Sequence, residues 1–221
     1  MKNIVVLFSG RGSNMIAIAR ACTEQGWPAR VAAAICNRPD APGLKAASQL
    51  GLQTEVLDSG AHPDRAEFDA LLAQRVDAHA PALVVLAGFM RILTDTFVHR
   101  YAGRLVNIHP SLLPAFPGLR THRQALAAGV KIHGATVHLV TRDLDAGPIL
   151  AQAAVPVLPG DDEETLGARV LAAEHRLYPT ALRWLVEDRV RVEGREVWLR
   201  DPADGPQVLD CLATSQTQAS T

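Results

Sequence analysis

The class of fold is decided by the stretch Asn3-Ile4-Val5-Val6-Leu7-Phe8-Ser9-Gly10-Arg11-Gly12-Ser13-Asn14. Residues 3–8 are an apolar, mainly β-branched run of strand length, residues 9–14 are rich in glycine, and residues 15–25 have the spacing of a helix. The order is therefore strand, glycine loop and helix, which is how units of a parallel α/β sheet begin.

The same alternation of strand and helix continues along the first half of the chain. Residues 82–87 are apolar at every position, as expected of a central parallel strand that helices cover on both faces. We therefore predict an α/β fold with a doubly wound, mostly parallel sheet and right-handed crossovers. The other elements predicted here are strands at 29–36, 53–57 and 104–109, a short helix that ends at Gly51, and a helix over 63–80.

The second half of the chain has a different character. Residues 134–140 and 148–157 are typical of two longer strands, and the Asp- and Gly-rich segment 141–147 joins them into a hairpin that extends the sheet. Four acidic residues at 161–164 suit the first turn of a long helix, which we expect to run to about Asp188. A C-terminal hairpin is predicted at 190–199. Residues 1–200 form a single domain on this view, and the polar segment 201–221 is expected to be a flexible tail.

Composition excludes several classes of protein. The 221 residues include 22 Lys and Arg against 23 Asp and Glu, without the clustered basic excess that nucleic-acid binding needs. Three widely spaced cysteines, Cys22, Cys36 and Cys211, give neither a disulfide framework nor a zinc site. We expect no signal peptide, because the sequence has no basic segment followed by an apolar one at its start, and no apolar run reaches membrane-spanning length. We expect a cytoplasmic protein with no metal, no nucleic-acid partner and no membrane association.

The segment Asn107-Ile108-His109-Pro110-Ser111-Leu112-Leu113-Pro114 carries the clearest chemical pattern. Asn107 and His109 are two residues apart on a predicted strand, so their side chains point to one face. They lie at the carboxyl end of that strand, where open α/β sheets bind ligands, and the prolines stiffen the chain that follows. An amide donor beside an imidazole suits an acyl-type transfer. The alternative is that both side chains only satisfy neighbouring backbone groups.

The glycine loop favours a phosphate ligand. Gly10 and Gly12 let an anion approach the backbone N–H groups at the start of a helix. Met15 stands where a dinucleotide fingerprint needs its third glycine, and the Lys-Ser/Thr ending of a P-loop is missing, so a single phosphate on a sugar is favoured. Alternatively, Ser13 or Asn14 only caps the helix. The two interpretations are compatible.

With these two segments and several others, the sequence closely resembles the phosphoribosylglycinamide formyltransferase family over nearly the whole chain. The resemblance implies a formyltransferase domain whose N-terminal half binds phosphate and whose C-terminal half binds folate. It also implies transfer of a formyl group from 10-formyltetrahydrofolate, the co-substrate, to the glycine amine of phosphoribosylglycinamide in purine biosynthesis. The segments that carry it are 9–14, 87–93, 107–114, 116–118, 133–134, 137–138 and 143–148.

The resemblance makes Asn107, His109 and Asp145 the catalytic group. Attack of an amine on a formyl carbon produces an oxyanion, which Asn107 and a protonated His109 would stabilise. Asp145 would favour the imidazolium form of His109, which can then protonate the departing folate nitrogen. No metal is needed for this chemistry. Considered alone, Asp145 is a turn residue ahead of Gly147.

The resemblance also implies the ligand contacts. Positive charge near the folate suits the carboxylates of its glutamate tail, although surface arginines are otherwise unremarkable. A lone helical glutamate is usually solvated. The substrate-binding residues are Gly12, Ser13, Asn14 and Glu174; the folate-binding residues are Arg65, Met90, Arg91, Ile92, Leu93, Asn107, Val140, Thr141 and Asp145. His138 would orient the catalytic pair, and His122 is predicted to begin a helix. Arg120 and Leu171 depart from the residues of some relatives.

Competing functions remain open on the sequence alone. A formyltetrahydrofolate deformylase and a methionyl-tRNA formyltransferase share the Asn-x-His chemistry, but the first typically adds an N-terminal domain and the second a basic C-terminal domain. We expect neither, since this chain starts at the sheet and ends in a polar tail. A phosphosugar- or folate-binding module without activity would not need Asn107, His109 and Asp145 together. A monomer and a homodimer are both compatible with the sequence.

Overall fold

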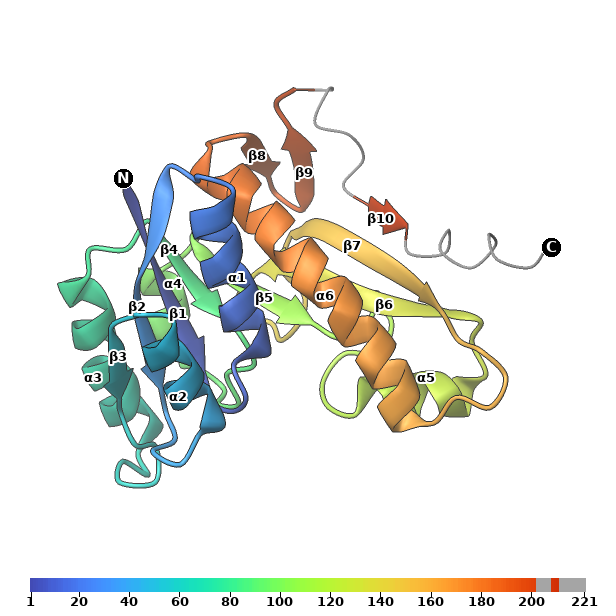
Figure 1. Ribbon diagram of the computed structural model, residues 1–221, viewed down its shortest axis with the longest axis horizontal. Helices are drawn as coiled ribbons and strands as arrows, with labels where there is room; N and C mark the ends of the chain where they lie inside the picture. The colour runs from blue at the N-terminus through green and yellow to red at the C-terminus, as the bar shows by residue number, and fades with distance from the viewer. Residues whose placement is uncertain (202–207, 211–221) are drawn as a thin grey trace.

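The computed structural model describes residues 1–201 and 208–210. Its main sheet has eight strands in the order β10-β7-β6-β5-β4-β1-β2-β3 (Figure 1). β6 runs antiparallel to β5 and β7, and the other pairs are parallel. The strands are β1 (Lys2–Phe8), β2 (Ala29–Cys36), β3 (Thr54–Val56), β4 (Leu83–Leu86), β5 (Leu105–His109), β6 (Ile132–Leu139), β7 (Ile149–Pro156) and β10 (Val208–Asp210), with a separate hairpin of β8 (Val190–Glu193) and β9 (Glu196–Leu199).

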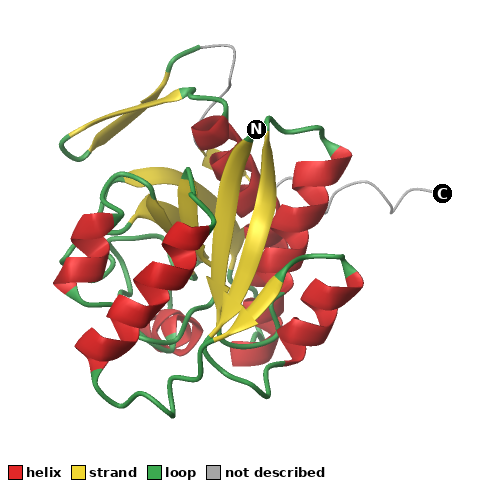
Figure 2. Ribbon diagram, turned by 90° about the vertical axis from the view of Figure 1, so that its left-hand side faces the viewer, coloured by secondary structure: helices red, strands yellow, loops and turns green. Residues whose placement is uncertain are grey.

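Helices cover both faces of this sheet, as Figure 2 shows. The core on one face includes side chains of α1, α2, α5 and α6, and the core on the other includes α3 and α4. The predicted doubly wound α/β fold is therefore confirmed, together with its C-terminal hairpin and long helix. The helices are α1 (Ser13–Glu24), α2 (Pro42–Gln49), α3 (Arg65–Ala78), α4 (Asp95–Arg100), α5 (Thr121–Ala128) and α6 (Glu163–Val186).

The apolar runs that predicted the sheet supply both cores. Along β1, Ile4 and Val6 pack on the α1 and α6 side, while Val5 and Leu7 pack on the α3 and α4 side. All four side chains are fully buried. A strand that feeds two cores has to be apolar at every position, because successive side chains alternate between the faces.

Capping decides where the helices begin. Asp162 forms a capping box with Thr165 at the start of α6. Glu163 and Glu164 occupy the first turn of this helix, so the acidic segment begins the long helix as predicted. Gly12 is the N-cap of α1, with a φ of 70° and no side-chain hydrogen bond. The alternative that Ser13 or Asn14 caps this helix is therefore wrong.

The C-terminal region contains an element that the sequence analysis did not assign. Residues 208–210 form β10, which pairs in parallel with β7 from Val208 against Gln152. The expected flexible tail otherwise falls on 202–207 and 211–221, which lie outside the described residues.

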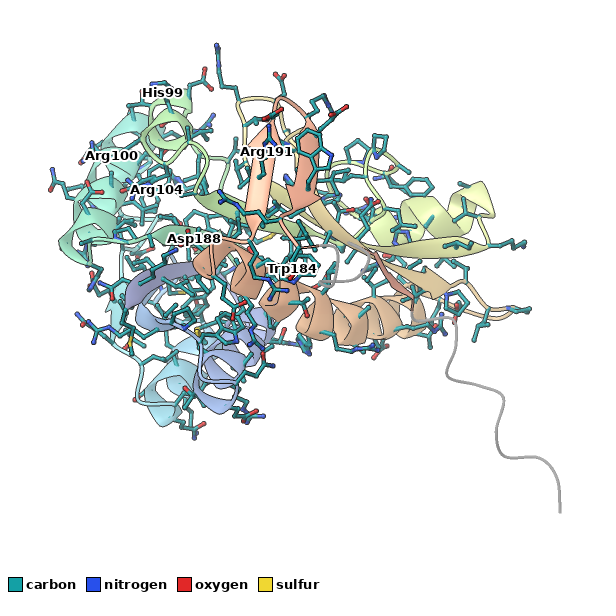
Figure 3. The ribbon with its side chains drawn as sticks, turned by 90° about the horizontal axis from the view of Figure 1, so that it is seen from above. His99, Arg100, Arg104, Trp184, Asp188 and Arg191 are labelled. Carbon is teal, nitrogen blue, oxygen red and sulfur yellow. The ribbon has the colours of Figure 1, made fainter. Side chains whose placement is uncertain are left out.

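Figure 3 looks onto the end of the molecule where α6 finishes. His99 and Arg100 belong to the last turn of α4, Asp188 follows α6, and Arg191 lies on β8. The charge of Arg100 suits the C-terminus of α4 and is paired with Asp77, which accounts for Arg100 without a ligand. Over the described residues, no helix is long and apolar enough to cross a membrane.

Candidate active site

A row of polar side chains lies on one face of β5, β6 and β7. Alternate residues of these strands, such as Val106, Val137 and Ala153, pack into the core below α6. The residues between them therefore face the opposite side of the sheet. They are Asn107, His109, Thr136, His138 and Gln152. Two loop segments, 111–118 and 141–147, contact this row.

The three predicted catalytic residues meet there. His109 Nδ1 lies 3.4 Å from Asp145 Oδ2, and the side chains of both residues are 6% exposed. His138 joins them, because its Nε2 lies 3.3 Å from Asn107 Nδ2 and 3.9 Å from Asp145 Oδ1. Asn107, His138, Asp145 and His109 thus form one continuous chain of contacts.

His138 has a defined orientation in this chain. Its Nδ1 lies 3.0 Å from the carbonyl oxygen of Leu139, which can only accept a hydrogen. Burial lowers the pKa of His138, so the ring is neutral and its Nε2 carries a lone pair. The lone pair accepts a hydrogen from Asn107 Nδ2. This contact fixes which way the Asn107 amide points.

Backbone groups of segment 116–118 complete the surroundings of His109 and Asp145. His109 Nε2 lies 3.0 Å from the carbonyl oxygen of Phe116, and Gly118 N donates to Asp145 Oδ2 at 2.9 Å. Asp145 has a φ of 53°, which Asp tolerates better than most residues. The turn interpretation of Asp145 and its contact with His109 are therefore both correct.

The predicted substrate residues lie at the carboxyl end of β1. Asn14 Nδ2 donates to Glu174 Oε2 at 2.7 Å, although the two residues are 160 positions apart. Both are buried, so the solvated alternative for Glu174 is wrong. Burial raises the pKa of Glu174, while the bond from Asn14 opposes this. The Asn14 Oδ1 atom is buried without a protein partner.

Three exposed apolar side chains lie on loops, two of them after β4 and one next to Asp145. Met90 and Ile92, which follow β4, are 69% and 65% exposed, and Leu144, next to Asp145, is 63% exposed. Exposed apolar groups gathered by loops are typical of a ligand surface. Ser9 connects this region to the glycine loop, since Met90 N donates to Ser9 Oγ at 2.7 Å.

The predicted folate arginines contact backbone carbonyls. Arg91 donates to the carbonyl oxygens of Ser59 and His62 at 3.3 and 3.1 Å, and its guanidinium lies 4.3 Å from the centre of the Phe68 ring. Arg65 donates to the Leu93 carbonyl oxygen at 3.2 Å. Both side chains therefore hold loops, whatever ligand they bind.

The remaining predicted positions are distributed as follows. Val140 is half-buried and packs against the α3 and α4 core, and the exposed Thr141 donates to the Asp143 carbonyl oxygen at 3.2 Å. His122 lies in the first turn of α5, as predicted, and its Nδ1 is 3.2 Å from His133 Nε2. Arg120 is the N-cap of α5, and Leu171 is 37% exposed on α6.

Three polar residues of this region were missed by the sequence analysis. Ser9, Thr136 and Gln152 are bonded to loop backbone around the site. The available signal was a polar residue inside an otherwise apolar strand, as Gln152 is in β7. Which loop such a residue meets depends on strand register, which the sequence does not show. Within the described residues, no group of three His, Cys, Asp or Glu side chains could hold a metal.

Comparison with known proteins identifies the family. Residues 2–182 match the sequence profile of the formyl transferases. The chain belongs to the formyl transferase family. A phosphoribosylglycinamide formyltransferase of Escherichia coli (strain K12) is 48% identical over 205 residues, which cover 93% of this chain and 97% of that protein.

Solved structures of formyl transferases agree with this assignment. The glycinamide ribonucleotide transformylase 1 of Symbiobacterium toebii has a TM-score of 0.88 and 50% identity, over 91% of this chain and 95% of that chain. A formyltetrahydrofolate deformylase of Pseudomonas syringae pv. tomato has a TM-score of 0.84 but 29% identity, over 90% of this chain and 66% of that chain. The resemblance seen in the sequence is therefore confirmed.

Proposed function

We propose that this protein transfers the formyl group of 10-formyltetrahydrofolate to the glycine amine of phosphoribosylglycinamide, a step of purine biosynthesis. Similarity to phosphoribosylglycinamide formyltransferases along nearly the full length of the E. coli relative supports this reaction. The observation that carries the proposal is the chain of contacts from Asn107 through His138 and Asp145 to His109.

Asn107 and His109 supply what the reaction needs. Folate, when bound, presents an activated formyl group whose oxygen becomes negative as the amine attacks. One amide hydrogen of Asn107 is donated to His138, and the second is free to stabilise that oxygen. The two ring nitrogens of His109 lie 3.0 Å from the Phe116 carbonyl oxygen and 3.4 Å from Asp145 Oδ2. His109 is placed to move the proton that balances the reaction, because the attacking amine loses one proton as the amide forms and the departing folate nitrogen gains one.

The other predicted residues fit the two ligands. Gly12, Ser13 and Asn14 begin α1, whose first N–H groups and dipole suit the substrate phosphate, and buried Glu174 suits a hydroxyl of its ribose. The exposed apolar side chains of Met90 and Ile92 suit the folate ring. Backbone groups at Leu93, Val140 and Thr141 would bind its polar edge. Arg65 and Arg91 would bind its glutamate carboxylates.

The test is a product assay with purified protein. Phosphoribosylglycinamide and 10-formyltetrahydrofolate should give formylated substrate, and donor consumption should be negligible when water is the only acceptor. Asn107→Ala and His109→Ala should each lower the rate by about 100-fold or more, with ligand binding retained. His99→Ala, at an exposed position of α4, is the matched control. Equal donor consumption without substrate would identify a deformylase, and full activity of both variants would exclude this mechanism.

A further inference from the structure

We infer that Gln152 is a positioning residue for the catalytic imidazole, acting through Thr136 and the loop that follows His109; this rests on the proposed function. Gln152 lies on β7 and pairs with Thr136 of β6. Thr136 in turn pairs with His109 of β5. The three side chains therefore form a row across three neighbouring strands.

The hydroxyl of Thr136 is the centre of a saturated network. It donates to the Ser111 carbonyl oxygen at 2.7 Å and accepts from Leu113 N at 3.0 Å. It also accepts from Gln152 Nε2 at 3.0 Å. One donated and two accepted bonds are the full capacity of a hydroxyl. Thr136 is fully buried, so any lost bond would go unreplaced by water.

Gln152 orients this hydroxyl. The Thr136 hydrogen is used by Ser111, so Thr136 can only accept from Gln152. Gln152 Nε2 also donates to the Leu113 carbonyl oxygen at 2.9 Å. Both acceptors require the amino group, which leaves one orientation for the amide. Gln152 thus fixes the rotation of the hydroxyl and holds Leu113 directly.

The loop held in this way carries the partners of His109. The carbonyl oxygen of Ser111, two residues after His109, accepts from Thr136. Further along the same loop, the Phe116 carbonyl oxygen lies against His109 Nε2. Gly118 N then binds the Asp145 carboxylate that faces His109 Nδ1. Segment 111–118 therefore places groups at both ring nitrogens. Loosening it shifts the imidazole, and a displacement of about 1 Å can cost about 100-fold in rate.

Isosteric variants test this inference. Gln152→Met removes both donors, and Thr136→Val removes the hydroxyl. Each should lower kcat for formyl transfer about tenfold or more, while KM for phosphoribosylglycinamide, which binds at the other loop, stays within about threefold. Thr136→Ser, which keeps the hydroxyl, should restore kcat. Thr180→Val is the control, because Thr180 is a half-buried threonine that donates to the Arg176 carbonyl oxygen of its own helix, away from the loop.

The double variant separates a shared network from two independent effects. If Gln152 acts through the same loop as Thr136, the double variant should lose less activity than the product of the two single losses. Each rate is divided by the fraction of folded protein, which circular dichroism measures. If Thr136→Val does not fold, the kcat of Gln152→Met, which changes a half-buried site, tests the inference by itself. Wild-type kcat in Gln152→Met, or multiplicative losses, would overturn the inference. A wild-type protein that transfers no formyl group would instead overturn the proposed function.

Discussion

Acid should destabilise this protein through His133, whose imidazole is buried on β6. His133 is 1% exposed. Burial, with the nearby imidazoles of His122 and His109, lowers the pKa of His133 from 6.5 to about 4. Between pH 6.5 and pH 4, the unfolded chain therefore binds a proton at His133 and the folded protein does not. His133 has no effect on the free energy of unfolding well above pH 6.5. Below pH 6.5 it lowers this free energy increasingly as the pH drops towards 4.

The size of this effect follows from the two pKa values. At pH 4 the unfolded chain is protonated at His133 and the folded protein is half protonated, which lowers the free energy of unfolding by about 3 kcal/mol. The pKa of His122 is also lowered by burial, against the opposing charge of Glu163, so its ring contributes in the same direction. The loss should centre on the contact between the two rings.

Urea unfolding at pH 7, 6, 5 and 4 measures this loss. His133→Gln removes the titrating group, so its unfolding free energy should fall by about 3 kcal/mol less than that of the wild type between pH 7 and pH 4. A lower starting stability of the variant does not matter, because only the change with pH is compared. His99→Gln, at an exposed position, should follow the wild type. Parallel curves for wild type and His133→Gln would refute the reasoning.

Three further outcomes are expected. Gly147→Ala would place a Cβ 1.8 Å from the Leu139 carbonyl oxygen, so the segment must move; kcat/KM for formyl transfer should fall about 100-fold in a steady-state assay. Asp162→Ala removes the N-terminal cap of α6 and should lower the free energy of unfolding by about 1 kcal/mol in urea. Leu72→Ala empties a fully packed position of α3 and should lower it by about 2 to 5 kcal/mol, measured in the same way.

The fold could be predicted because a strand that is buried on both faces is apolar at every position. Residues 82–87 have no polar position, and β4 occupies their centre, at 83–86. Boundaries were less accurate where caps decide them: the helix expected from residue 63 begins at Arg65, after the Asp64 cap. β10 could not be predicted, since its strand conformation comes from pairing with β7 and not from its own sequence.

Some residues of the candidate site could likewise be predicted from the sequence, and others could not. Asn107 and His109 were found because a spacing of two residues on a strand has a fixed geometric meaning. Glu174 was assigned only through a family resemblance, and its contact with Asn14 spans 160 positions. Gln152 was missed, because a one-residue change in the register of β6 and β7 would put it on a different partner. Local periodicity reveals a face of an element, and tertiary pairing decides what that face meets.

Asp145 combines a turn conformation with a contact to the His109 imidazole. Its positive φ places the carboxylate between two loops, where Gly118 N holds Oδ2 and His109 Nδ1 lies 3.4 Å away. Gly147 lets the same turn pass against the Leu139 carbonyl, where any side chain would collide. The residues that shape the turn therefore also set the distance between carboxylate and imidazole. The interpretation of Asp145 as a turn residue is therefore correct, but it leaves out the contact with His109.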